Sequence, residues 1–202
     1  MPNTRAAQVR MSAVEVQIGG FGGQGVVLAG MVIGRGLVLC EGYNVSLMQS
    51  FGPEARGGAC GVQLVVSRDP IFYPYVTRSN ILVALSQEAY RKFVPQLQEG
   101  GTLLVEKDMV RPENIPSSIR VFSVPATRLA EELGRKLVLN MVVVGFFAAM
   151  TGLLQTDSAQ RAIAEAVPEG TQALNLAAFE KGYEYGIQNF PTLPPNPSSL
   201  GG

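Results

Sequence analysis

A glycine-rich segment near the start of the chain has the residue types and spacing of a phosphate-binding turn. Gly20, Gly22 and Gly25 satisfy the pattern GxGxxG, and Gly23 and Gln24 fill its last two variable positions. An apolar run of strand length precedes the motif and an apolar run with helical spacing follows it, which is the context that the motif requires. Glycines let backbone approach a phosphate closely, and free N–H groups at a helix start can hold an anion. These five residues are therefore our first candidates for cofactor binding.

A nicotinamide dinucleotide would need one more group, an acidic side chain at the end of the second strand, to hold the ribose hydroxyls. The second predicted strand ends in Gln49 and Ser50. Glu41 lies before that strand, so its spacing of about 20 residues from the first glycine is coincidental under this interpretation. A stand-alone dinucleotide-binding oxidoreductase is thus an alternative that rests on the glycines alone.

A second glycine-dense segment, SFGPEARGG, follows the second predicted strand and begins at Ser50. It carries one acid and one base, Glu54 and Arg56, beside Gly57 and Gly58. Arg56 could make a two-pronged contact with a phosphate or carboxylate, and the glycines would let a large ligand come close. The same two charges could instead pair with each other and fix the loop. We include Glu54, Arg56, Gly57 and Gly58 among the candidate cofactor-binding residues.

The rest of the composition restricts the chemistry that the chain can carry out. It contains no histidine, which removes the commonest general base and metal ligand and any Ser-His-Asp or Cys-His nucleophile. Cys40 and Cys60 are too few for a Cys₄ cluster and lack CxxC spacing, so we expect no zinc and no iron–sulfur cluster in this chain. We assign it no catalytic residue and no metal ligand.

Charge and targeting signals indicate a cytoplasmic protein that binds neither nucleic acid nor membrane. The 16 basic residues equal the 16 acidic ones, so no net field attracts the chain to an anionic polymer or surface. The first residues lack an unbroken apolar segment followed by a small-residue cleavage site, and two scattered cysteines fit a reducing compartment.

The segment from Leu137 to Leu154 contains no charge and approaches the length of a membrane span. It contains Asn140, Gly145 and Thr151, lacks Trp and Tyr, and belongs to an α/β pattern. We therefore expect a buried or subunit-contact helix there, since helices that are apolar all round lie in cores or in membranes.

The elements that must position these residues alternate between strands and helices, which predicts a single α/β domain with a layered, mostly parallel sheet, flanking helices and a helical C-terminal cap. The expected strands are Val14 to Ile18, Tyr43 to Gln49, Val62 to Ser67, Ile81 to Leu85, Thr102 to Val105 and Arg120 to Val124. The expected helices are Val26 to Leu39, Gln87 to Leu97, Ala126 to Leu133, Leu137 to Leu154, Ser158 to Ala166 and Thr171 to Ile187. Between the second and third strands, Phe51 to Gly61 is expected to be a loop. Residues 1–13 are interpreted as a flexible arm, 14–187 as the domain and 188–202 as a Pro-rich tail.

Three segments together resemble a known family. GGFGGQGVVLAGMVIG, then SFGPEARGG, then LVLNMVVVGFFAAMTGL are similar, in that order and at familiar separations, to the gamma subunit or gamma domain of 2-oxoacid:ferredoxin oxidoreductases. The similarity extends from about Val14 to about Ile187.

The resemblance implies a complex that decarboxylates a 2-oxoacid on thiamine diphosphate, passes electrons through iron–sulfur clusters to ferredoxin, and forms an acyl-coenzyme A. Thiamine diphosphate, magnesium and the clusters would belong to alpha and beta subunits and a possible ferredoxin-like subunit. This chain would close over the active site and help to position coenzyme A. The form of its SFGPEARGG segment resembles subunits of 2-oxoglutarate enzymes more than those of indolepyruvate enzymes. A non-catalytic scaffold, whose glycine-rich loops only pack against partners, is the other alternative.

Overall fold

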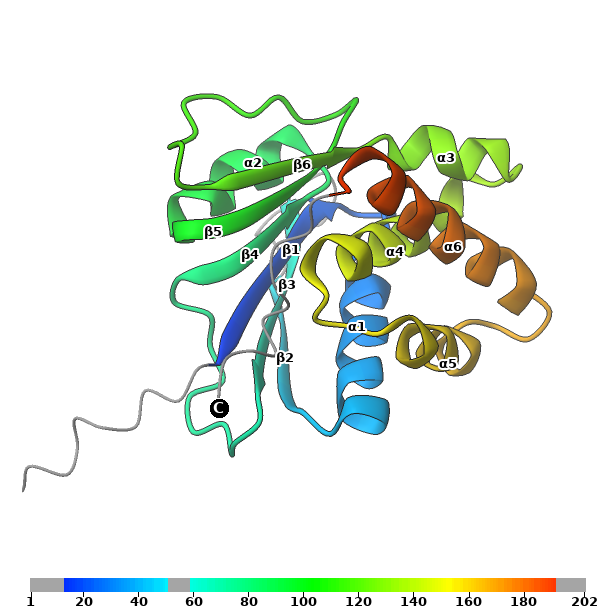
Figure 1. Cartoon of the computed structure of the whole chain (residues 1–202), viewed down its shortest axis with the longest axis horizontal. Helices are drawn as coiled ribbons and strands as arrows, with labels where there is room; N and C mark the ends of the chain where they lie inside the picture. Colours follow the sequence, from blue (N-terminus) through cyan, green and yellow to red (C-terminus); the bar gives the residue numbers. More distant parts are fainter. Residues whose placement is uncertain (1–12, 51–58, 192–202) are drawn as a thin grey trace, which may run out of the picture.

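A single mixed sheet forms the centre of the molecule (Figure 1). The computed structural model describes residues 13–50 and 59–191. Six strands lie in the order β2-β3-β1-β4-β5-β6. β3 is antiparallel to both β1 and β2, whereas β1, β4, β5 and β6 are parallel to their neighbours in turn, so only β3 runs against the others. The bounds are β1 Val14–Phe21, β2 Asn44–Ser50, β3 Ala59–Ser67, β4 Ser79–Ala84, β5 Leu97–Glu106 and β6 Arg120–Val124.

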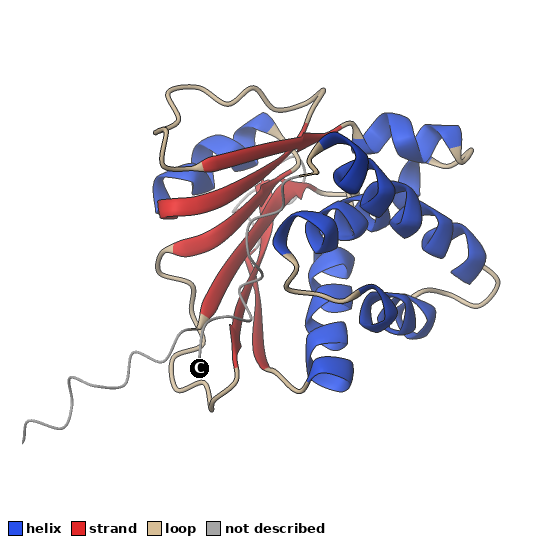
Figure 2. Ribbon diagram, in the orientation of Figure 1, coloured by secondary structure: helices blue, strands red, loops and turns tan. Residues whose placement is uncertain are grey.

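Helices cover both faces of this sheet, as Figure 2 shows. One face packs against α1 and the C-terminal helices in the larger buried cluster, and α2 covers part of the other face in a smaller one. The bounds are α1 Val26–Glu41, α2 Gln87–Phe93, α3 Ala126–Glu132, α4 Leu139–Thr151, α5 Thr156–Ala166 and α6 Gln172–Asn189, with short 3-10 turns at Val94–Gln96 and Lys136–Val138. The predicted α/β class, the mostly parallel sheet and the helical C-terminal cap are confirmed.

Several predicted boundaries were wrong, and pairing or proline explains them. The predicted helix Gln87 to Leu97 ends at Phe93, because Pro95 in the following 3-10 turn has no N–H to continue it. β5 begins at Leu97, five residues before the predicted start at Thr102, and passes through Gly100 at φ +74° where the register with β4 shifts. The predicted loop Phe51 to Gly61 is too long at its end, since β3 already begins at Ala59, paired with an extension of β1.

The charge-free segment forms a helix inside the molecule, as predicted, although it is shorter than Leu137 to Leu154. All 13 residues of α4 are buried, and α6 lies against it along its length. The helix ends where Gly152 adopts φ +61°. Within residues 13–50 and 59–191, no helix is both long and apolar enough to cross a membrane. The charge-free helix is therefore a core element of this fold.

The predicted arm and tail fall almost wholly in residues 1–12 and 192–202, outside the described part of the chain. α6 continues to Asn189, two residues into the segment predicted as tail.

Candidate functional site

The first glycine motif forms the turn between β1 and α1, and two of its glycines are required by packing. A Cβ added to Gly20 would lie 2.5 Å from Oε1 of Gln24 and 2.9 Å from a methyl group of Val26. Gly25, the residue before α1, has φ +69°, and a Cβ added to it would overlap the side chain of Asn140. These glycines let the turn fold back between α1, α4 and the end of β4.

The other two glycines of the motif face outward. Gly22 and Gly23 are exposed, and a Cβ added to either would meet no atom within 4 Å. Gly23 has φ +94°, a conformation that favours glycine, whereas Gly22 has no such restraint. The turn therefore presents bare backbone to its surroundings, which is what close approach of a ligand or a partner chain requires.

Gln24 is held inside the turn by its own side chain. Its Oε1 accepts the N–H of Phe21 at 2.6 Å, and its Nε2 donates to the carbonyl of Leu85 at 3.0 Å and lies 3.5 Å from Sδ of Met109. The side chain is 9% exposed. Direct ligand contact by Gln24 stays a prediction, whereas its observed contacts fix the shape of the turn and join it to the segments after β4 and β5.

The second glycine motif lies mostly outside the described residues, including Glu54, Arg56, Gly57 and Gly58. The strand residues on either side of it are placed. Ala59 pairs with Phe21 at the end of β1, and Ser50 pairs with Gly61, two strands from the same end of β1. The chain therefore leaves β2 and enters β3 within roughly 10 Å of the first motif, given a strand spacing of about 4.8 Å. The sheet therefore brings the two ends of the second motif to the edge formed by the carboxyl ends of the parallel strands, where the first motif also lies.

Cys60 is the described thiol nearest to this edge. Its Sγ donates to the carbonyl of Gly20 at 3.4 Å, and burial raises the pKa of the thiol above its ordinary value, opposed by a backbone hydrogen bond and by the charge of Lys92. The thiol is therefore protonated near neutral pH, and a protonated thiol is a poor nucleophile. Cys40 lies near the far end of α1, about 20 Å along the helix from its start, so the two cysteines cannot share a ligand.

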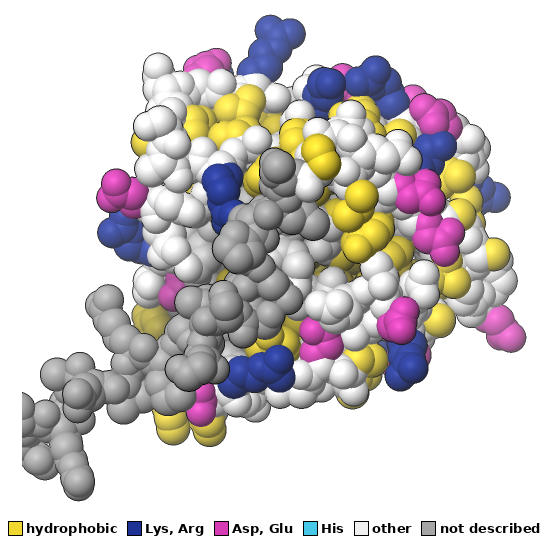
Figure 3. Space-filling model, in the orientation of Figure 1, with side chains coloured by type: hydrophobic (Ala, Val, Ile, Leu, Met, Phe, Trp, Pro, Cys, Tyr) yellow, Lys and Arg dark blue, Asp and Glu magenta, His cyan; other side chains and the backbone are white. Residues whose placement is uncertain are grey.

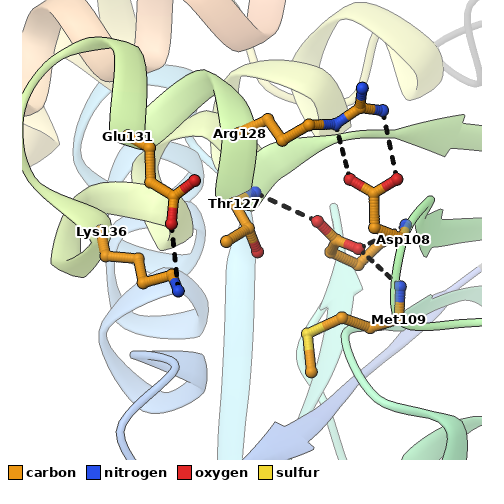
Figure 4. A network of polar contacts seen from close by, with 7 residues as sticks. Asp108, Met109, Thr127, Arg128, Glu131 and Lys136 are labelled. Carbon is orange, nitrogen blue, oxygen red and sulfur yellow. Dashed lines mark hydrogen bonds and ion pairs between the residues drawn. The ribbon is translucent and has the colours of Figure 1, made fainter.

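A buried carboxylate at the end of β5 was missed by the sequence analysis. Glu106 is 0% exposed, and its carboxylate accepts the backbone N–H groups of Asp108 at 2.7 Å, Met109 at 2.9 Å and Thr127 at 3.1 Å. Figure 4 shows the nitrogens of Met109 and Thr127 directed at this carboxylate, and Asp108 facing Arg128. Arg128 holds Asp108 with two contacts, of 2.7 and 3.1 Å, at the surface. The signal in the sequence was an acid directly after the apolar run Leu103 to Val105.

These contacts join the glycine turn to the segments that follow β4 and β5 at the same edge of the sheet. Glu106 fixes the segment that carries Met109, and Met109 contacts Gln24, which shapes the glycine turn. The edge is also a topological switch point, because the chain leaves β1 toward β2 and β3 on one side, while β4 lies on the other side. In open α/β sheets, ligands bind beyond the carboxyl ends of the strands at such points. A cavity of about 970 Å³ lies at the opposite edge, beside Glu15, Asn80 and Glu99, so the switch point rather than that cavity marks the candidate site.

The strand order also bears on the dinucleotide alternative. β3 separates β2 from β1, so the end of β2 is not beside the glycine turn as it is in the nicotinamide-binding arrangement. Glu41 lies at the far end of α1, where its carboxylate accepts the N–H of Gln155 at 2.7 Å. Neither the end of β2 nor Glu41 therefore places an acidic side chain beside the glycine turn, where it could bind a ribose.

Comparisons with known proteins agree with this fold. Residues 15–185 match the family described as pyruvate ferredoxin/flavodoxin oxidoreductase. The chain is 41% identical over 184 residues to the 2-oxoglutarate synthase subunit KorC of Methanocaldococcus jannaschii, covering 90% of this chain and 97% of the relative. Its structure is similar to the gamma subunit of a keto/oxoacid ferredoxin oxidoreductase from Geobacter sulfurreducens, with a TM-score of 0.76, 34% identity and coverage of 87% and 99% of the two chains.

A further solved structure shows the same fold within a longer chain. The 2-oxoglutarate:ferredoxin oxidoreductase from Magnetococcus marinus, with 2-oxoglutarate, coenzyme A and succinyl-CoA bound, aligns with a TM-score of 0.81 at 20% identity. The alignment covers 91% of this chain and 32% of that one. At this identity the likeness shows the fold alone.

Proposed function

Because the chain belongs to the pyruvate ferredoxin/flavodoxin oxidoreductase family, we propose that it is the gamma-type subunit of a 2-oxoacid:ferredoxin oxidoreductase whose substrate is 2-oxoglutarate. The observation that supports the subunit role best is that the chain and the KorC subunit of Methanocaldococcus jannaschii match over nearly their full lengths. That relative is a subunit of a 2-oxoglutarate synthase, which supports 2-oxoglutarate as the substrate.

In the proposed reaction, thiamine diphosphate supplies the decarboxylation chemistry and iron–sulfur clusters carry the electrons to ferredoxin, while the acyl group passes to coenzyme A. We assign thiamine diphosphate, magnesium and the clusters to the alpha, beta and possible ferredoxin-like partner subunits. Neither cysteine of this chain is placed to share a ligand with the other, which supports that division of roles.

The role proposed for this chain is to close over the active site and position coenzyme A. Exposed backbone at Gly22 and Gly23 can approach phosphates of coenzyme A, and N–H groups at the start of α1 favour an anion there. The ends of the second motif reach the same edge, so Arg56 is proposed to supply the charged contact to a phosphate.

Adding a side chain at Gly22 tests coenzyme A positioning without disturbing the fold. Gly22 has open space around it and no positive φ, so Gly22→Val should fold and assemble normally. We expect its apparent KM for coenzyme A in the assembled complex to rise about ten-fold or more, which corresponds to roughly 1.4 kcal/mol, with unchanged affinity for 2-oxoglutarate. Gly34→Ala is the matched control, since its methyl group would make ordinary contacts with Leu64, Val45 and Leu47, away from the turn.

Arg56→Ala provides an independent arm of the same experiment. Loss of a hydrogen bond between charged groups costs about 1.5–3 kcal/mol, so the apparent KM for coenzyme A should rise roughly ten- to a hundred-fold while the complex stays assembled. Complexes that fall apart in either variant would favour the scaffold function instead. Unchanged coenzyme A dependence in both variants would remove this edge from the coenzyme A site. Co-purification of the wild-type chain from its native cell, followed by assay with several 2-oxoacids, tests the subunit and substrate assignments separately.

A further inference from the structure

The cavity at the edge of the sheet opposite to the glycine turn has a volume of about 970 Å³. The first residues of β1, β4 and β5 and the loop between β3 and β4 line it. The backbone N–H of Glu15 in β1 donates to Oδ1 of Asn80 in β4 at 2.7 Å, which joins two of these strands at the cavity. Its volume is within the usual range of ligand pockets, so it can accept a ligand or a segment of chain.

The charged side chains that line this cavity are mostly acidic. The lining contains three carboxylates, from Glu15, Asp69 and Glu99, and one guanidinium group, from Arg78. Within the part of the chain that the structure describes, none of these four side chains forms an ion pair. Three negative charges against one positive charge leave a net charge of −2 at the cavity. Such a field favours a cationic occupant.

One of these carboxylates also holds the loop between β3 and β4 in place. Oε2 of Glu15 accepts the backbone N–H groups of Thr77 at 2.7 Å and Arg78 at 2.9 Å, whereas Oε1 accepts only the hydroxyl of Thr77, at 3.4 Å. A carboxylate has about four acceptor positions, so Oε1 keeps capacity for a charged donor. The lining is therefore built by hydrogen bonds and still offers an acceptor to a ligand.

Exposed aromatic rings lie beside the carboxylates. Phe72 and Tyr73 both line the cavity and are 88% and 61% exposed, and the ring of Tyr75 lies 5.4 Å from that of Tyr73. Figure 3 shows hydrophobic side chains projecting at the lower corner of the molecule, where Figure 1 places the loop between β3 and β4. Aromatic rings stack on guanidinium groups, and carboxylates accept two parallel hydrogen bonds from them. This combination fits an arginine side chain.

The first residues of the chain provide arginine side chains next to this cavity. Residues 1–12, MPNTRAAQVRMS, lie outside the described residues and contain Arg5 and Arg10 but no acidic residue. Ala13, which follows them, lines the cavity. Arg10 is three residues before Ala13, so the chain keeps it within roughly 10 Å of the lining. A group on so short a tether has an effective concentration on the order of millimolar, an advantage that a basic segment of another chain lacks.

We propose that this cavity is a guanidinium-binding site whose occupant is residues 1–12 of the same chain, with Arg10 bound between the carboxylates and the aromatic rings. The carboxylates of Asp69 and Glu99 accept hydrogen bonds from the guanidinium group, and Phe72 and Tyr73 stack on it. The bound segment covers the end of the sheet that is opposite to the glycine turn. This inference is independent of the proposed enzymatic function.

Trypsin cleavage of the folded full chain after Arg10 tests the proposal, because a bound guanidinium group cannot enter the specificity pocket of the protease. We expect the double variant Asp69→Asn, Glu99→Gln to be cleaved there about five-fold faster than the wild type, which corresponds to roughly 1 kcal/mol. Glu15 is left intact because it holds the loop. Glu169→Gln, which removes an exposed acid between α5 and α6, is the matched control and should leave the rate unchanged.

Ionic strength provides a second arm of this experiment. At roughly 1 M salt the Debye length is about 3 Å, so cleavage after Arg10 in the wild type should approach the rate of the double variant. The double variant and the wild type should then differ little. A wild-type chain that is cleaved at low salt as fast as the double variant overturns the proposal, because the cavity is then free for a partner chain.

Crosslinking identifies what residue 10 contacts. Arg10→Lys keeps the charge and introduces an amine, which a carbodiimide joins to a carboxylate in direct contact. We expect mass spectrometry of the monomeric chain to show a crosslink from position 10 to a carboxylate of the cavity. The exposed pair of Lys136 and Glu131, 3.0 Å apart, is the internal control for the reaction.

Two results of the crosslinking contradict the proposal. If the control pair is joined and position 10 is not joined to the cavity, the segment does not bind there. If position 10 is joined to the cavity only in covalent dimers, or if protection from trypsin increases with protein concentration, a second copy supplies the arginine instead.

Discussion

The crossing of α4 and α6 depends on two glycines, which makes Gly182→Ala a sharp test of the packing. A Cβ on Gly182 would overlap the carbonyl oxygen of Val142 and lie 2.7 Å from its carbonyl carbon. Gly145 on the facing helix has the same relation to Phe179, whose carbonyl oxygen its Cβ would overlap. The backbones therefore touch directly at this crossing, and a methyl group can be accommodated only if the helices move apart.

The magnitude follows from what such a displacement breaks. The crossing is lined by the fully buried rings of Phe146 and Phe179, and a gap of 0.5–1 Å loses about a quarter to a half of the dispersion attraction across it. Overpacking of this kind costs about 3 kcal/mol at the upper end of its usual range. Alanine is a better helix former than glycine by about 1 kcal/mol, so we expect a net loss of roughly 2 kcal/mol in the free energy of unfolding.

Denaturant and thermal unfolding of the isolated chain measure this loss. For a chain of this size, 2 kcal/mol corresponds to a fall in Tm of about 4–8 °C. Gly34→Ala is again the matched control, because its methyl group lies 3.4 Å from Leu64 and makes ordinary contacts, so only the gain in helix propensity remains. It should be neutral or stabilise by up to about 1 kcal/mol. The reasoning is refuted if Gly182→Ala is as stable as the parent or as Gly34→Ala.

Three further predictions concern the core, the polar edge and the redox chemistry. Phe146→Asp should prevent the isolated chain from folding, because it buries an unpaired charge at a residue that is 0% exposed; a variant with the parent's unfolding curve would contradict this. Glu106→Gln should lower the free energy of unfolding by about 2 kcal/mol, because an amide nitrogen then replaces one oxygen that accepts backbone N–H groups. Asp108→Asn removes only an exposed ion pair and should cost less than about 1 kcal/mol. Equal losses in the two variants would show that burial does not set the difference. The purified chain alone should be colourless and inactive toward 2-oxoacids, and visible cluster absorbance intrinsic to this polypeptide would overturn the assignment of the clusters to partners.

Local sequence signals were sufficient to predict the kinds of elements and most of their positions along the chain. Hydrophobic period, glycine and proline are local signals, so the strand–turn–helix at the first glycine motif and the charge-free helix could be predicted from residues close in the chain. The boundaries that failed depend on distant partners. Ala59 belongs to a strand because Phe21 is opposite it, and β5 begins at Leu97 because Ser79 is there to pair with it.

The arrangement of the candidate site, in contrast, depends on long-range pairing and packing. Nothing local indicates that β3 inserts between β1 and β2, yet that order places the start of β3, where the second motif ends, beside the first motif, and leaves the end of β2, where the second motif begins, one strand further away. The sequence grouped Gly20, Gly22, Gly23, Gln24 and Gly25 as equivalent ligand contacts, whereas packing divides them into two that fit against neighbours, two that face outward and one amide that is bound internally. Glu106 became significant only when folding removed its carboxylate from water and placed three backbone N–H groups around it. The sequence specifies the residue at each position, but contacts between segments far apart in the sequence determine which atoms are buried, hydrogen-bonded or exposed.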